Sequence, residues 1–365
     1  MSNLRALLHQ EVLTATYDKG APGVQTPLTD RFFTSPQNWD TNEASFLIRP
    51  ATRTAAPLNK PFATARQLAL QGKSKSAGAI FHAFNSFTLS PEVFQGLIEP
   101  DSNVVQQIAR REINDQMEHF SRMHQIQKEL VTAKMLVDGV VYIGPNGDVL
   151  ESSSGAETTA SFGVAASHQN TASGLVQPFD DEHTDISEVF EDIDEQAREE
   201  NAPAPEIAIC NSVMKRYIRA NVNFRTFAAQ HMEGQRVLYG EIVEGLFGKT
   251  WVFIDSTYTD VNGTVRKFIP DDKLILVPGS NDWLQAVNGM TMVPNSLDVG
   301  PTLDSIVASA SMQYGAFSYA KAEHNPMRLD VYAGEPAGAS VGSNSSQAIG
   351  SKSSSCPYFK MASKT

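Results

Sequence analysis

The chain has 365 residues, 41% of them hydrophobic and 19% charged, which are the proportions of a soluble globular protein with room for about two domains. Its formal net charge of -12 argues against a general nucleic-acid binder, because neutralising phosphates requires a surplus of Lys and Arg, although an acidic protein can still enclose DNA. No apolar run is long enough for a membrane span or a signal peptide, and two cysteines argue against a disulfide framework, so we expect a reducing compartment.

Charge is unevenly distributed along the chain. Residues 44–91 contain no acidic residue, and residues 180–200 contain eleven acidic residues against one basic residue, Arg198. This split suggests contacts between copies of the protein, and a solvated loop beside a solvated helix is the alternative. The basic residues that would make such contacts are Arg53, Lys60, Arg66, Lys73 and Lys75.

The N-terminal part predicts an arm followed by a loop. Residues 1–48 have weak periodicity, with a short helix expected at 4–13 and an aromatic anchor in TDRFFTSPQNW (29–39). In residues 49–88, strand-like segments (63–71 and 79–89) flank GKSKSAG (72–78). We therefore predict a long β-hairpin with a small, flexible and positive tip at 72–78.

The strongest helix signal follows. It begins at a cap on Asp101 or Ser102 and ends at Gly139, about 36 residues or 50 Å. Helical spacing predicts one buried face, made of Ile113, Met117, Phe120, Met123, Ile126, Leu130, Ala133 and Val137. His119 and His124 are five residues apart and miss the spacing of a zinc helix, so we expect both to face solvent.

The middle of the chain predicts a hairpin and an acidic helix. VVYIGPNGDVLESS (140–153) should turn at residues 145–147, and residues 151–178 are poorly patterned. The acidic helix should bury Ile186, Val189, Phe190 and Ile193 on one face.

The remainder predicts an α/β unit. We expect strands at 206–212, 249–256 and 273–278, and one helix over 213–230. A hairpin should turn at Asn262-Gly263 in a type I′ turn, with positive φ at both residues, and project from the unit. MRLDVYAGEP (327–336) should pair with an earlier segment, and the low-complexity residues after Gly338 should be flexible.

Motifs for chemistry are missing from the sequence. It has no nucleotide-binding glycine loop and no nucleophile elbow, and Cys210 after an apolar strand reads as a packed thiol. The acidic residues around His183 read as a helix entry. We therefore expect no catalytic residue, cofactor or metal. The rival is an α/β enzyme with a site built from CNS (210–212), DST (255–257) and PDD (270–272) at strand ends.

Two segments carry a family resemblance. TDRFF (29–33) and YTDVNGTVRKFIPDDKLILVPGS (258–280), placed around a long charged helix, resemble elements of the major capsid proteins of tailed bacteriophages, specifically the lambda capsid protein E family with the Hong Kong 97-type fold. The resemblance spans most of residues 25–335. The chain departs from the family pattern in the Ser/Ala-rich insert at 151–178 and in the Ser/Gly-rich tail.

The resemblance implies an α+β shell protein without enzymatic activity. Its expected parts are an arm (1–48), an extended loop (49–88), a peripheral domain with the spine helix (89–178 and 321–336), an axial domain (179–320) containing the Asn262-Gly263 hairpin, and a flexible tail (337–365).

The same resemblance implies partners and a location. Copies would assemble as hexamers and pentamers into an icosahedral head that encloses double-stranded DNA without reading its sequence. Portal, scaffolding and decoration proteins are expected partners. We expect the protein in the virion, after assembly in the host cytoplasm and without membrane contact. A non-viral compartment shell of the same fold is a further alternative.

Overall fold

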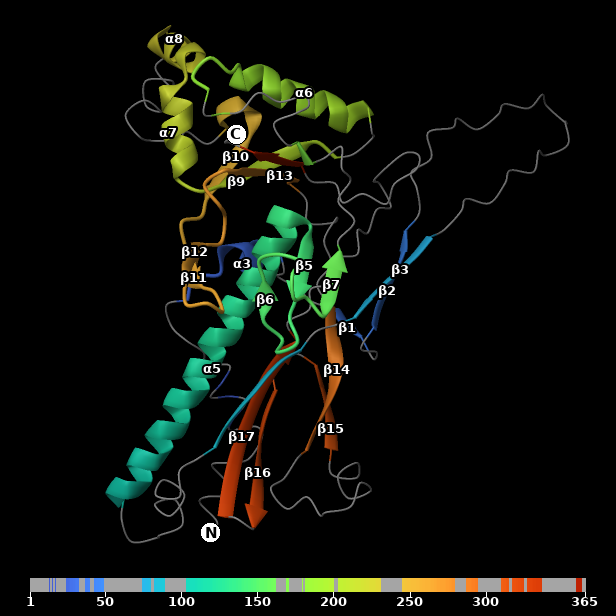
Figure 1. Ribbon diagram of the computed structural model, residues 1–365, viewed down its shortest axis with the longest axis vertical. Helices are drawn as coiled ribbons and strands as arrows, with labels where there is room; N and C mark the ends of the chain where they lie inside the picture. The colour runs from blue at the N-terminus through green and yellow to red at the C-terminus, as the bar shows by residue number, and fades with distance from the viewer. Residues whose placement is uncertain are drawn as a thin grey trace, which may run out of the picture. The chain divides into compact units, whose positions relative to one another are not determined.

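The computed structural model describes residues 13, 15, 17, 24–32, 37–39, 43–48, 74–79, 82–88, 103–161, 169–170, 179, 181–199, 203–230, 245–279, 287–294, 310–314, 317–324, 327–336 and 359–362 (Figure 1). The chain divides into two compact units, which we describe separately. The first comprises Met1–Ala44, Gly78–Thr132 and Ala286–Ser340, and the second comprises Ser45–Ala77, Ala133–Gln285 and Val341–Thr365.

The first unit contains two three-stranded sheets. In one, the order is β16-β17-β4, all antiparallel (Phe317–His324, Met327–Pro336, His82–Thr88). In the other, the order is β1-β14-β15 (Gln37–Trp39, Val287–Pro294, Ala310–Tyr314), and β1 pairs with β14 in parallel. The prediction that residues 327–336 pair with an earlier segment is confirmed, because β17 pairs with β4.

The long helix is α5, Asn103–Asp138, and its predicted ends are confirmed (Figure 1). Gly139 has a φ of 67°, and its N–H donates to the Met135 carbonyl at 2.9 Å, so glycine closes the helix in a left-handed conformation. Residues 103–132 of the helix belong to the first unit and the remainder to the second.

The predicted buried face of α5 is confirmed at both ends and wrong in the middle. Ile113, Met117 and Phe120 are buried, as are Leu130, Ala133 and Val137. Met123 and Ile126, however, are 44% and 38% exposed. The buried positions in the middle turns hold the polar residues Ser121, His124 and Glu129, so His124 faces the interior rather than solvent, while His119 is exposed as predicted.

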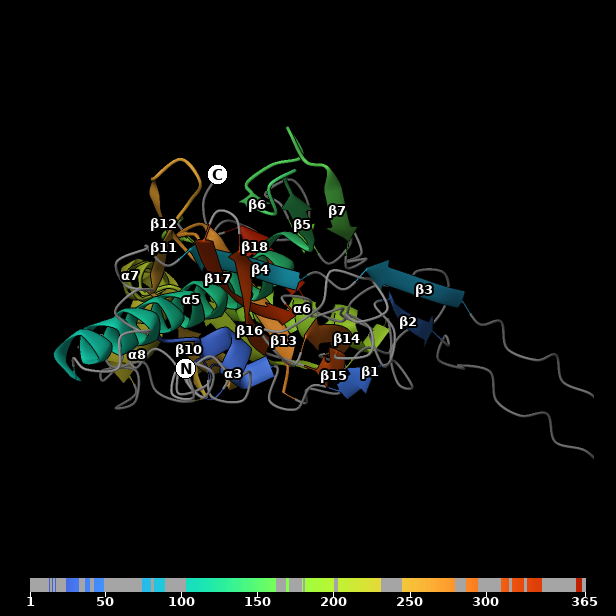
Figure 2. The same cartoon turned by 90° about the horizontal axis from the view of Figure 1, so that it is seen from below.

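The predicted loop hairpin and the structure differ in which segments pair. Residues 74–79 form strand β3 (Ser74–Ala79), which pairs with β2 (Glu43–Ile48), as Figures 1 and 2 show. Most of the expected tip at 72–78 is therefore strand, because its partner is the segment before the loop. Residues 63–71 lie outside the described residues.

The second unit is built on a five-stranded sheet in the order β10-β9-β13-β18-β8 (Thr250–Phe253, Pro205–Cys210, Lys273–Pro278, Phe359–Ala362, Gln169–Asn170). Strand β10 pairs with β9 in parallel, and β13 pairs with β9 and β18 in antiparallel. The predicted strands β9, β10 and β13 are confirmed. Strands β8 and β18 were not predicted and come from the insert and the tail.

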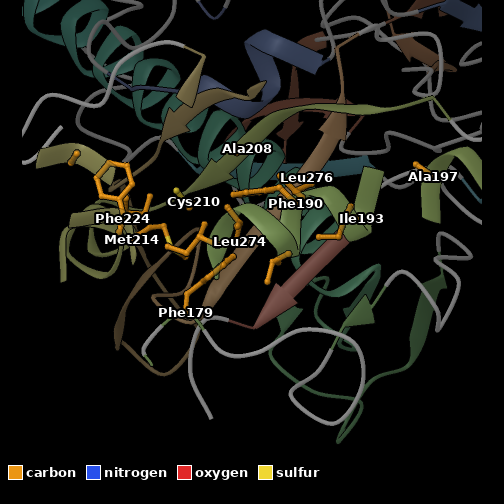
Figure 3. Close-up of a cluster of buried hydrophobic side chains, with 14 residues drawn as sticks. Phe179, Phe190, Ile193, Ala197, Ala208, Cys210, Met214, Phe224, Leu274 and Leu276 are labelled. Carbon is orange, nitrogen blue, oxygen red and sulfur yellow. The ribbon is translucent and has the colours of Figure 1, made fainter. Parts of the chain in front are cut away.

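The apolar core of this unit lies between the sheet and its helices (Figure 3). Helix α6 (Ile186–Glu199) buries Ile186, Val189, Phe190 and Ile193 as predicted. Cys210 of β9 is fully buried in the same cluster, which confirms a packed thiol. Burial also raises the pKa of this thiol, so it is a poor nucleophile.

The segment 213–230 is two helices rather than one. Helix α7 (Val213–Ala220) ends at Asn221, whose ψ of 127° is extended, and α8 (Val222–Gln230) follows. The Asn221 side chain explains the break. Its carbonyl oxygen accepts the Phe224 N–H at 2.8 Å, and its amide donates to the Thr184 carbonyl at 2.6 Å. A one-turn 3-10 helix, η2 (Leu246–Gly248), precedes β10.

Two small antiparallel sheets complete the second unit. One has the order β6-β5-β7 (Val149–Leu150, Val140–Ile143, Thr158–Ser161), and the other is the ribbon β11-β12 (Thr257–Thr259, Val265–Lys267). Both hairpins turn in the same way, because Gly147 and Gly263 each donate to the carbonyl three residues earlier and have φ of 81° and 79°.

The predicted type I′ turn is therefore wrong, because only Gly263 has a positive φ. Residues 261–263 form a three-residue loop between Asp260 and Thr264, with glycine at its last position. The Asp260 carboxylate accepts the N–H of Asn262 at 2.9 Å and of Thr264 at 2.8 Å. This side-chain turn holds Asn262 at negative φ, which the Asn-Gly pair alone does not reveal.

Among the described residues, no helix combines the length and the apolar character needed to cross a membrane.

Candidate assembly elements

The N-terminal segment is attached to helix α5 by a buried carboxylate. Helix α3 (Pro27–Phe32) begins against Glu129, whose side chain has no solvent exposure. The two oxygens of Glu129 accept the N–H groups of Leu28 and Thr29, each at 2.9 Å, and the Thr29 hydroxyl at 2.7 Å. Glu129 thus caps a helix of another segment, since these N–H groups have no partner within the helix.

The same segment contacts α5 at a second point. The Tyr17 hydroxyl lies 2.6 Å from Nδ1 of His124, and Nδ2 of Asn85 in β4 lies 2.9 Å from Nε2. Both ring nitrogens of His124 therefore lie within hydrogen-bond distance of a polar group, one from the N-terminal segment and one from β4. The Phe120 ring stacks on His124 and meets Phe87 of β4 edge-on. Phe120 therefore packs against β4.

In the second unit, Glu151 connects the ribbon β11-β12 to the end of α5. One oxygen accepts the Tyr258 hydroxyl at 2.6 Å, and the other accepts Lys134 Nζ at 2.5 Å. Burial alone would raise the pKa of Glu151, but hydrogen bonds from Lys134 and Tyr258 outweigh it and hold that pKa below its usual value. Burial and the bond to Glu151 raise the pKa of Tyr258.

The ribbon β11-β12 is therefore packed on one face, and its projection from the unit stays a prediction. Tyr258 is buried and packs on Phe268, with ring centroids 5.1 Å apart. Beside it, Arg266 donates to Asp260 at 2.7 Å. Val261 and Val265 are 55% and 66% exposed, so the turn and the second strand still present apolar side chains to solvent.

The acidic helix α6 has the amphipathic form that its sequence predicts. Asp185 caps its start by accepting the N–H of Ser187 at 3.0 Å, which agrees with a helix entry near His183. The exposed face carries carboxylates, namely Glu188, Glu191, Asp192, Glu195 and Glu199. Asp194 instead binds the buried Lys249 ammonium at 2.6 Å, which pins the helix to the start of β10.

Only one of the predicted basic contact residues can be placed. Lys75 lies in strand β3, whereas Arg53, Lys60, Arg66 and Lys73 lie outside the described residues. Their contacts with another copy stay a prediction.

The three segments of the rival enzyme site do meet at one end of the sheet. The Asn211 amide donates to Asp271 and to the Ile269 carbonyl, and the Ser212 N–H donates to Asp255 at 2.9 Å. The Ser212 N–H holds the pKa of Asp255 below its usual range. These polar groups satisfy turns and the start of α7, and none joins a nucleophile to a base. No cluster of potential metal ligands occurs among the residues that the structure describes.

The described residues form an α+β fold in which these polar side chains connect elements of the same chain. Residues 11–293 match the family model of phage major capsid protein E. The chain therefore belongs to this family and is a capsid shell protein.

Solved structures agree with this family. A prophage protein from E. coli CFT073, described as a capsid protein, is similar over 97% of this chain and 98% of that chain, at 12% identity and a TM-score of 0.53. This likeness supports the predicted Hong Kong 97-type fold, which is confirmed.

Two other similar structures are more distant. The capsid asymmetric unit of cyanophage A-1(L) covers 86% of this chain and 88% of its own, at 11% identity and a TM-score of 0.40. An encapsulin complex from Synechococcus elongatus PCC 7942 covers 96% and 94%, at 10% identity and a TM-score of 0.38. No curated protein matches the sequence.

Proposed function

We propose that the chain assembles as hexamers and pentamers into an icosahedral head shell that encloses viral double-stranded DNA. The observation that carries the proposal is the family match over residues 11–293, joined to the fold of the prophage capsid protein. Many modest interfaces repeated around closed symmetry give a stable shell without any single strong contact. The protein has no catalytic role, and DNA is contained rather than read.

The proposal assigns roles to the segments. Residues 1–48 are the arm, 49–88 the extended loop, 89–178 and 321–336 the peripheral domain, and 179–320 the axial domain. Arg53, Lys60, Arg66, Lys73 and Lys75 meet an acidic surface of a neighbouring copy, for which the outer face of α6 is the candidate. The ribbon with Asn262 and Gly263 presents its exposed turn to other copies near a symmetry axis.

Partners and place of assembly follow from the same role. A closed head needs an opening for DNA and a way to set its size, so portal and scaffolding proteins are proposed partners, with a decoration protein on the outer surface. Assembly takes place in the host cytoplasm, and the product is the virion capsid.

Expression of the chain alone tests the proposal. We expect closed particles of megadalton mass by sedimentation and negative-stain microscopy. A small oligomer whose melting temperature rises with a small-molecule ligand would instead support the enzyme built on the strand ends. Particles that package cellular protein rather than DNA in infected cells would support a compartment shell.

A further inference from the structure

The insert and the tail, which depart from the family pattern, meet in the second unit. Strand β18 of the tail pairs antiparallel with β13, with Lys273 opposite Ala362 and Leu276 opposite Phe359. Strand β8 of the insert pairs with β18 in parallel, with Lys360 opposite Gln169. Together they extend the sheet by two strands beyond β13.

Without β18, one edge of the apolar strand β13 would be open to pairing with another chain. Its residues Leu274, Ile275, Leu276 and Val277 have no solvent exposure, and β9 already occupies its other edge. Removing β18 would leave the backbone N–H and C=O groups of an apolar strand without strand partners along that edge. Such an edge is a template for pairing with another chain. A two-residue outermost strand such as β8 offers a much shorter template.

The segment that joins β17 to β18 is rich in small residues. Residues 337–358 separate β17 from β18, and 14 of these 22 residues are Gly, Ser or Ala. This composition is typical of linkers, and the contacts that the structure describes for β18 are its pairings with β13 and β8.

We propose that β18 is a removable cover, and that it prevents the β13 edge from pairing with the same edge of a second copy. Two β13 strands related by a two-fold axis run antiparallel, as β13 and β18 do, so the self-pairing is geometrically available. The cover acts in the unassembled subunit, and its test does not depend on the symmetry of the shell.

The test uses a chain that ends after Pro336 and a fluorescent peptide of residues 357–365. We expect the shortened chain to bind the peptide and to form dimers and larger species by sedimentation, which the peptide reverses. The full chain should bind it at least about tenfold more weakly, because its tethered β18 competes at an effective concentration of about millimolar. A scrambled peptide is the control. A shortened chain that neither self-associates nor binds the peptide would overturn the proposal.

Two further measurements cover misfolding and strand exchange. If the shortened chain is insoluble, refolding with the peptide should restore soluble protein, and failure of that rescue counts against the cover. In the full chain with Cys356→Ser, the pair Lys273→Cys and Ala362→Cys should form a disulfide within one chain, because these residues are opposite in the register. Absence of that bond, or a bond between two chains, contradicts a cover supplied by the same chain.

Discussion

At the residue scale, Glu129 is a buried carboxylate whose hydrogen bonds all go to another segment. Replacing it with Gln leaves one acceptor oxygen for the donors of Leu28 and Thr29, so one of them loses its partner. We expect Glu129→Gln to lower the free energy of unfolding by about 1–3 kcal/mol, measured by urea denaturation. Glu118→Gln on the exposed surface of the same helix is the control, with a loss below about 1 kcal/mol.

Glu129 also makes a prediction about pH. Burial raises the pKa of Glu129 above its ordinary value of 4.5, so the folded chain holds this proton more tightly than the unfolded chain. Its stabilising contribution is therefore full below pH 4.5 and is lost as the pH rises through the folded pKa. The stability difference between wild type and Glu129→Gln should shrink across that rise. A difference that is constant or grows would show that the folded pKa is not raised.

Gly263 tests the corrected turn. A Cβ at this position would meet no atom within 4 Å, so a side chain is opposed only by the φ of 79°. Gly263→Val should cost roughly 1–2 kcal/mol of unfolding free energy, and Gly263→Asn clearly less, because Asn tolerates a left-handed backbone. Equal effects of the two substitutions would show that φ is not the constraint.

The conformation or burial of some single residues could not be predicted, because it depends on side-chain contacts. The positive φ of Gly263 could be predicted from its place between strands, but the negative φ of Asn262 depends on the Asp260 carboxylate. His124 reads as a surface residue by type, and its partners Tyr17 and Asn85 come from distant segments that its local sequence does not reveal.

At the element scale, helix α5 was predicted closely because its caps and spacing are local. Its predicted buried face was wrong in the middle turns, where buried polar residues form hydrogen bonds with other segments in place of apolar packing. Phe120→Ala should lower the unfolding free energy by about 3–5 kcal/mol, since the ring is 7% exposed and contacts Phe87 and His124. Met123→Ala, three residues later and 44% exposed, should change it by less than about 1 kcal/mol in the same urea titration. Similar losses of unfolding free energy in both variants would contradict the assignment of Phe120 to the buried face and Met123 to the exposed face.

The attachment of the ribbon β11-β12 can be measured as a coupling. We expect a double-mutant cycle of Glu151→Gln and Tyr258→Phe to give an interaction energy of about 0.5–3 kcal/mol, because the two groups share a hydrogen bond. The exposed pair Lys267 and Asp271 is the comparison and should couple by at most about 0.5 kcal/mol. A ribbon that projects freely would give no coupling between Glu151 and Tyr258.

Strands β9, β10 and β13 could be predicted because they are continuous apolar runs between turn residues. Strands β8 and β18 could not, since they contain two and four residues and lie in segments of low complexity. Their conformation depends on the edge of β13, which no local pattern encodes.

At the scale of the whole molecule, the ordered set of parts predicted the family, while the contacts between copies remain a prediction. Reversing Lys73 and Lys75 to Glu should reduce the yield of closed particles without changing the melting temperature of the subunit. Each exposed ion pair contributes only about 0.2–1 kcal/mol, but the contact repeats throughout a shell. Particle yield is measured by sedimentation and microscopy. Lys73→Arg with Lys75→Arg keeps the charge and should assemble normally. A normal yield of particles from the Glu variant would show that these lysines do not contribute to the interface.

The position of β18 along the chain sets a delay during synthesis. Strand β13 ends at Pro278, and 80 residues (279–358) must be translated before Phe359. At about 5–20 residues per second, this takes on the order of ten seconds. For much of that time the β13 edge of a nascent subunit has no β18 with which to pair. The codons for residues 279–358 thus control how long each new chain is exposed to mispairing, and slower translation there should increase the aggregated fraction.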